Sequence, residues 1–163
     1  MPKVIIALEN DISTDDIYPG RFMATVLPTE TPQFAFFDRT EFNAQLKAKV
    51  FPAGSIIVGG ENFGCGSSRE QACSTLKGLE VAIVAKSISR IFLQNSINLG
   101  LQVVICPTVE ASVGDELEIT ADQVLNQTTG RAFDQVKLPA ACKGIMDAGG
   151  LIPYTRARLM ARS

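Results

Sequence analysis

Residues 59–70 read GGENFGCGSSRE, and this stretch decides which kind of fold the chain can adopt. Its four glycines allow sharp turns and let the backbone come close to a ligand. The apolar run Ser55–Gly59 leads into it, and Ser67-Ser68-Arg69-Glu70 has the S-x-x-E form of a helix capping box. We therefore expect a strand, a glycine-rich loop and a helix over 68–77, with Gly78 as its C-terminal stop.

The same stretch has the chemistry of an anion site. Free N–H groups and the dipole of a helix N-terminus favour negative charge in the preceding loop. Arg69 adds a planar guanidinium group that can bind a carboxylate through two parallel hydrogen bonds. With the hydroxyls of Ser67 and Ser68 beside it, the loop is suited to a small carboxylic acid.

A glycine-rich loop of this kind has three other interpretations. A Walker loop needs G-x-x-x-x-G-K-[ST], but Ser67 follows Gly66 and the loop has no lysine. A dinucleotide loop needs G-x-G-x-x-G, and Arg69 stands where its third glycine belongs. A purely structural role, with the glycines in a tight turn and Ser67 as a cap, stays open. The crowding of two serines and an arginine favours the anion site.

The order of the predicted elements indicates one α/β domain over residues 1–163. Strands and helices alternate, which is typical of a parallel sheet with right-handed crossovers. Ligands of such sheets bind at the carboxyl ends of the strands, where residues 60–68 fall. A β-rich appendage and two helices follow. The expected strands are 4–8, 55–59, 81–85, 101–105, 115–120, 123–126 and 131–138, and the expected helices 34–49, 68–77, 87–98, 140–148 and 153–161.

Composition excludes several classes of protein. The formal net charge of −2 and the pI near 5.2 give no basic footprint for nucleic acid. The apolar runs are too short to cross a bilayer, and the N-terminus does not have the form of a signal peptide. The four cysteines are far apart without a C-x-x-C pair, so a reduced, cytoplasmic chain is expected.

Histidine is absent from the sequence, which restricts the possible chemistry. No Ser-His-Asp triad or Cys-His dyad can form, and histidine-based metal sites are excluded. Cys65 lacks a histidine to activate it and is a poor nucleophile candidate. The acidic segment Glu9–Asp16 reads as solvated turn carboxylates, or as a loop that brings Asp15 to the mouth of the anion site. Both interpretations stay open.

Residues 60–72, GENFGCGSSREQA, closely resemble the signature of the swivel domain of the aconitase superfamily. Within it, the chain is most similar to the free-standing small subunits of 3-isopropylmalate dehydratase. The resemblance implies a swivelling β/β/α domain with a parallel three-layer core and a small antiparallel appendage. It extends over nearly the whole chain, through Ser13–Asp15, Ser89–Gly100 and Gly149–Leu151.

The resemblance also implies a reaction and a partner. In this family a large subunit holds a [4Fe-4S] cluster, and the small subunit closes over a hydroxy-dicarboxylic acid. Ser67 would then be the catalytic base and Asp15 an active-site acid. Gly66, Ser68 and Arg69 would bind the substrate, and the chain would be inactive without its partner. The resemblance implies no metal ligand in this chain and no nucleic-acid or membrane partner.

The resemblance further implies where substrate choice is made. Relatives that act on a substrate with an extra carboxylate have an arginine in a Tyr-Leu-Arg-Thr run. The matching run here is Phe22–Thr25, so Ala24 replaces that arginine. An apolar lining favours isopropylmalate, or a short-chain relative such as 2,3-dimethylmalate, over homoaconitate. Another hydroxy-acid, namely 2,3-dimethylmalate, citramalate or homoaconitate, is the alternative substrate. Arg21 is a candidate to supply the cation that is missing at position 24. The alternative function for the whole chain is a non-catalytic anion-binding module.

Overall fold

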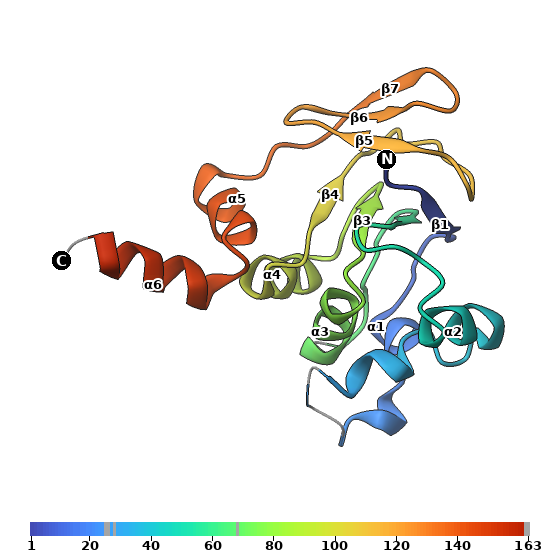
Figure 1. Cartoon of the computed structure of the whole chain (residues 1–163), viewed down its shortest axis with the longest axis horizontal. Helices are drawn as coiled ribbons and strands as arrows, with labels where there is room; N and C mark the ends of the chain where they lie inside the picture. Colours follow the sequence, from blue (N-terminus) through green and yellow to red (C-terminus); the bar gives the residue numbers. More distant parts are fainter. Residues whose placement is uncertain (25–26, 28, 68, 162–163) are drawn as a thin grey trace.

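The structure, a computed structural model, describes residues 1–24, 27, 29–67 and 69–161. Figure 1 shows its layers: an antiparallel sheet (orange), a parallel sheet beneath it, and helices that cover the far face of the parallel sheet. In these residues the parallel sheet has the order β1-β2-β3-β4 and the antiparallel sheet the order β5-β6-β7. The predicted β/β/α arrangement is therefore confirmed.

The parallel strands are β1 (Val4–Ala7), β2 (Ile56–Gly59), β3 (Ala82–Ala85) and β4 (Val103–Ile105). Ile57 lies opposite Ile83 and Ile83 opposite Val103, whereas the register between β1 and β2 shifts between Val4 and Ile6. Consecutive side chains point to opposite faces of a strand. Val84 packs toward the antiparallel sheet, whereas Ile83 packs toward the helices. Because both faces are covered, these strands read as continuous apolar runs.

The antiparallel sheet is the predicted appendage, formed by β5 (Leu117–Ile119), β6 (Gln123–Asn126) and β7 (Arg131–Asp134). Its buried residues Leu117, Val124 and Phe133 share a core with Val4, Ile56, Val58, Val84 and Val104 of the parallel sheet. Burial on one face explains its alternating sequence pattern.

Six α-helices are described, and all except α1 were predicted, some of them with different ends. Their bounds are α1 (Thr14–Ile17), α2 (Thr40–Lys47), α3 (Glu70–Gly78), α4 (Arg90–Leu99), α5 (Ala140–Asp147) and α6 (Leu151–Ala161). Short 3-10 helices occupy η1 (Gly20–Phe22) and η2 (Thr31–Phe34). None of the helices in the described part of the chain is long and apolar enough to cross a membrane.

Two of the helix predictions were wrong at their starts. The helix expected from Phe34 begins at Thr40, because Phe36 has a φ of 50° and fills the core from a turn. The aromatic spacing thus reflects ring packing, with Phe22 stacked on Phe34 at 4.2 Å between centroids. Ser87 does not cap α4. Its Oγ accepts a hydrogen bond from the Asn62 N–H, and the helix starts after Ser89.

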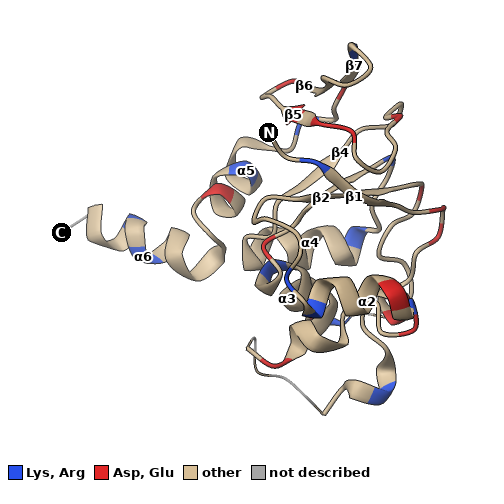
Figure 2. Ribbon diagram, turned by 45° about the vertical axis from the view of Figure 1, so that its right-hand side comes forward, with Lys and Arg blue, Asp and Glu red and all other residues tan. Residues whose placement is uncertain are grey.

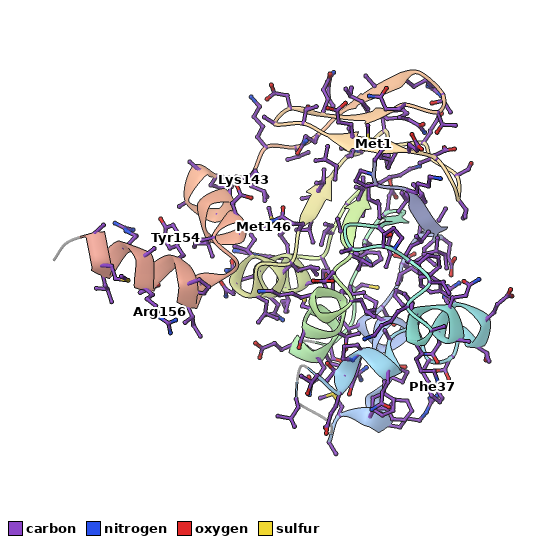
Figure 3. The ribbon with its side chains drawn as sticks, viewed as in Figure 1. Met1, Phe37, Lys143, Met146, Tyr154 and Arg156 are labelled. Carbon is purple, nitrogen blue, oxygen red and sulfur yellow. The ribbon has the colours of Figure 1, made fainter. Side chains whose placement is uncertain are left out.

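The last two helices leave the body of the molecule as an arm (Figure 1). Met146 of α5 is buried beside α4, and Tyr154 lies near the junction of α5 and α6 (Figure 3). The arm is attached where Lys77 donates hydrogen bonds to the carbonyls of Leu99 and Gly149. Gly100, the predicted helix stop, adopts a φ of 78° and lies against the backbone of Gly149.

The close approach of Gly100 and Gly149 gives a testable prediction. In Gly100→Ala a Cβ would overlap the Gly149 backbone and also strain the positive φ. Gly130→Ala is the matched control, because its φ is 75° and no described atom lies within 4 Å of the new Cβ. Gly100→Ala should lower the free energy of unfolding by about 1–3 kcal/mol more than the control does, which is the typical cost of overpacking. Equal losses in urea unfolding would contradict this packing.

Candidate active site

The site lies where the loops after β1 and β2 run side by side. The Gly64 N–H donates to the Ile12 carbonyl at 2.7 Å, and the Thr14 N–H donates to the Cys65 carbonyl at 2.8 Å. Ser13 and Cys65 form a parallel bridge. Segments about 50 residues apart in sequence are therefore joined backbone to backbone, at the carboxyl ends of parallel strands as the sequence predicted.

The glycines of the loop serve two different purposes. At Gly64, with a φ of 80°, a Cβ would overlap the buried side chain of Phe92. Gly66 has a φ of 95°, but the nearest described atom to its Cβ position is Thr14 Oγ1 at 3.6 Å. The first glycine therefore permits packing inside the protein. The backbone at Gly66 is exposed and open to a ligand.

Asp15 is brought to this loop by α1, a short helix that was not predicted from the sequence. Ser13 and Asp16 form a capping box, in which the Ser13 Oγ accepts from the Asp16 N–H and Asp16 accepts from the Ser13 N–H. The S-x-x-D spacing was the available signal, overlooked because Asp is also a common turn residue. The acidic segment is thus not simply a solvated turn, and the interpretation that places Asp15 beside the glycine-rich loop is correct.

Asp15 and Arg69 form an ion pair at the centre of the site. The Arg69 Nη1 donates to Asp15 Oδ1 at 2.6 Å, and the Gly20 N–H donates to the same oxygen at 2.8 Å. The Gly20 N–H and then the Arg69 guanidinium hold the pKa of Asp15 below its usual value. Asp15 is therefore a carboxylate at neutral pH. It orients Arg69, whose side chain is only 19% exposed.

The predicted capping of α3 by Ser67 is wrong. The helix begins at Glu70 after Arg69, which has extended backbone and makes no side-chain cap bond. Ser67 stays outside the helix because the Thr14 Oγ1 donates to its carbonyl at 2.8 Å. Ser67 is exposed to solvent beside the N-terminus of α3. Ser68 lies outside the described residues, so its predicted contact with substrate stays a prediction.

The predicted specificity residue Ala24 lies in an exposed turn after η1. The Gln71 Nε2 donates to the neighbouring Met23 carbonyl at 3.4 Å, which connects this turn to the first turn of α3. Arg21 forms an ion pair with Asp38, and its guanidinium carbon lies 5.3 Å from the centroid of the Phe37 ring. Its guanidinium group is thus engaged on the protein surface.

The described residues offer no ligand set for a metal. They contain no group of three or more Cys, Asp or Glu side chains arranged to hold an ion. Burial raises the pKa of the Cys73 thiol to about 12 and that of Cys106 to about 11, so both stay protonated. Figure 2 shows acidic and basic residues interspersed over the body of the molecule, whereas α6 carries basic side chains without acidic ones.

Comparison with known proteins now defines the class. Residues 29–107 match the family model of the aconitase C-terminal domain. A crystal structure of 3-isopropylmalate dehydratase from Methanocaldococcus jannaschii superposes with a TM-score of 0.87 and 33% identity, over 99% of this chain and 95% of that one. The fold is that of an aconitase-like swivel domain.

Curated relatives define the particular family. The isopropylmalate/citramalate isomerase small subunit of M. jannaschii is 41% identical over 92% of this chain and 90% of its own. The 3-isopropylmalate dehydratase small subunit of Methanosarcina mazei is 40% identical over 94% of both chains. The chain belongs to the family of 3-isopropylmalate dehydratase small subunits, which are components of a hydro-lyase. A small subunit implies a large-subunit partner.

The Asp15–Arg69 pair predicts a pH response. Because the pKa of Asp15 is lower in the folded protein, the pair stabilises the fold fully above pH ~4, the ordinary pKa of Asp. This stabilisation is lost as the pH falls through the pKa that Asp15 has in the folded protein. Arg69→Met should raise the pKa of Asp15, measured by NMR titration, only part of the way back to the usual value for Asp, because the hydrogen bond from the Gly20 N–H remains. Arg39→Met, which breaks a pair with Glu9, is the control and should leave it unchanged. An unchanged midpoint in Arg69→Met would contradict the pairing.

Proposed function

We propose that the chain is one half of the active site of a dehydratase that removes and re-adds water on an alkyl-malate, with 3-isopropylmalate as the favoured substrate. The observation that carries this proposal is the Arg69–Asp15 pair beside the exposed Ser67 and the open backbone of Gly66. A fixed guanidinium group with nearby backbone N–H groups suits a substrate carboxylate. We further propose that residues 1–163 act as one domain.

In this proposal Ser67 removes the proton from the carbon next to a substrate carboxylate. A serine hydroxyl is too weak a base in water, so Ser67 has to act as its alkoxide, which becomes the neutral hydroxyl when it takes the proton. That alkoxide needs nearby positive charge. The N-terminus of α3, the N–H groups of the loop and Arg69 provide it. Asp15 keeps Arg69 in place, and Ser68 is assigned to the same carboxylate. Asp15 was predicted as an active-site acid. Because Asp15 is an ionised carboxylate, it has no proton to donate, and we assign it the role of orienting Arg69.

The exposure of the site supports the need for a partner. Gly66 and Ser67 face solvent in this chain, where water would weaken every electrostatic contact. A large subunit that closes over them would exclude this water. When bound by that subunit, a [4Fe-4S] cluster would supply a Lewis acid for the substrate hydroxyl. The four cysteines are free thiols, which suits a reducing compartment, and we place the protein in the cytoplasm.

The choice of an alkyl substrate rests on Ala24. Its turn carries a methyl group where relatives for more highly charged substrates carry an arginine, and Arg21 is occupied by Asp38. A third substrate carboxylate would therefore lack a cation here, and burying it unpaired is costly. The M. jannaschii relative is named for both isopropylmalate and citramalate, and neither has a third carboxylate. Both substrates are therefore proposed for this chain.

Ser67→Ala tests the proposed base. Reconstituted with the large subunit, the variant should lose at least about a hundredfold in kcat, the usual range for an acid–base group. The melting temperature and the affinity for the large subunit should stay unchanged, because the residue is exposed. Ser112→Ala in a distant surface turn is the control. Near-normal turnover of Ser67→Ala would refute the role. Strong malate binding by the isolated chain in calorimetry would favour an anion-binding module instead.

Ala24→Arg tests the specificity assignment. The new cation should raise KM for isopropylmalate and improve kcat/KM for homoaconitate relative to isopropylmalate by about tenfold or more, because it pairs with the extra carboxylate. Met23→Arg, one residue earlier in the same turn, is the control for added charge. An equal shift in both variants would show that charge in the turn acts at long range and that position 24 does not line the substrate.

A further inference from the structure

Thr14 is buried at the first residue of α1 and contacts the loop that carries the proposed base. Only 3% of its surface is exposed. Its Oγ1 donates a hydrogen bond to the Ser67 carbonyl at 2.8 Å, across 53 residues of sequence. The same residue donates its backbone N–H to the Cys65 carbonyl. Thr14 therefore holds two residues of the glycine-rich loop.

The hydrogen bond from the Thr14 side chain to Ser67 adds one more link to the row of backbone hydrogen bonds between the two loops. The backbone itself cannot make this link. The ladder between the two loops runs through Gly64 to Ile12 and through Thr14 to Cys65. After Thr14 the chain enters α1, whose turn uses the Thr14 carbonyl for the Tyr18 N–H. The next backbone groups therefore point along the helix and no longer across to the loop. The Thr14 hydroxyl bridges the remaining distance to Ser67.

We infer that Thr14 is a positioning residue that fixes Ser67 in the orientation needed for proton abstraction. This inference rests on the proposed function of Ser67. Thr14 and Asp15 are consecutive on a helix fastened by the Ser13–Asp16 capping box, and they hold Ser67 and Arg69 respectively. One rigid turn therefore sets the spacing between the base and the carboxylate-binding group.

The physical need for such a contact is clear from the conformation of the loop. Ser67 follows Gly66, which has a φ of 95° and few neighbours, and it precedes the start of α3. A glycine loop has high conformational freedom. A reacting group displaced by about 1 Å can cost about a hundredfold in rate. A single buried donor on the Ser67 carbonyl limits this freedom at the residue whose side chain reacts.

The test uses the complete complex with the large subunit. Thr14→Val keeps the shape and removes the donor, whereas Thr14→Ser keeps the hydroxyl. Thr14→Val should lower kcat about ten- to a hundredfold with KM changed less than about threefold. Thr14→Ser should stay within about threefold of the native kcat. Thr75→Val is the matched control, because Thr75 is equally buried and its hydroxyl has no partner among the described residues. It should keep full activity.

Several outcomes would overturn the inference. One is native kcat in Thr14→Val, another is an equal loss in Thr14→Val and Thr14→Ser, and a third is a loss that appears in KM with kcat intact. The Ser67→Ala variant separates this inference from the function on which it rests. Normal turnover of Ser67→Ala refutes the proposed function, whereas an inactive Ser67→Ala with a fully active Thr14→Val refutes the positioning role alone. Melting temperature and binding of the large subunit, measured for each variant, show whether a loss comes from unfolding.

Discussion

The pairing of the loop after β1 with the loop after β2 is the constraint on which the site depends. Backbone hydrogen bonds from Gly64 to Ile12 and from Thr14 to Cys65 bring α1 against the glycine-rich loop. This contact places Asp15 at 2.6 Å from Arg69. Without it the loop would be a turn between a strand and a helix, and the guanidinium group would lack a fixed direction.

The site is assembled from charged groups that hold one another in place. A backbone N–H and a guanidinium group point at the same Asp15 oxygen and keep the pKa of Asp15 below its usual value. Arg69 is thereby fixed at the edge of an exposed loop, next to the N-terminus of α3. Such positive character, with no set of metal ligands among the residues that the structure describes, suits one half of a shared active site. The proposed large subunit would supply the other half and exclude water.

Much of the fold could be read from the sequence, because buried parallel strands leave continuous apolar runs and turns leave glycines. The four parallel strands were expected within about two residues of their ends, and Gly100 was correctly expected to end α4. Errors arose where tertiary packing replaced local preference. The α-helix expected from residue 34 starts later, because Phe34 stacks on Phe22 and Phe36 packs against Phe42. The S-x-x-E pattern at Ser67 predicted a cap but is not used as one.

The sequence by itself determined the order of the strands and of the helices from α2 onward, the glycine-rich loop and the residue types of the anion site. These follow from local rules of burial, turning and capping that act over a few residues. Only the tertiary structure decided that Thr14 and Asp15 hold Ser67 and Arg69, because these contacts join segments more than 50 residues apart. It also decided that Ser67 stays outside the helix. No local pattern encodes a hydrogen bond whose partner is selected by the packing of two loops at the edge of a sheet.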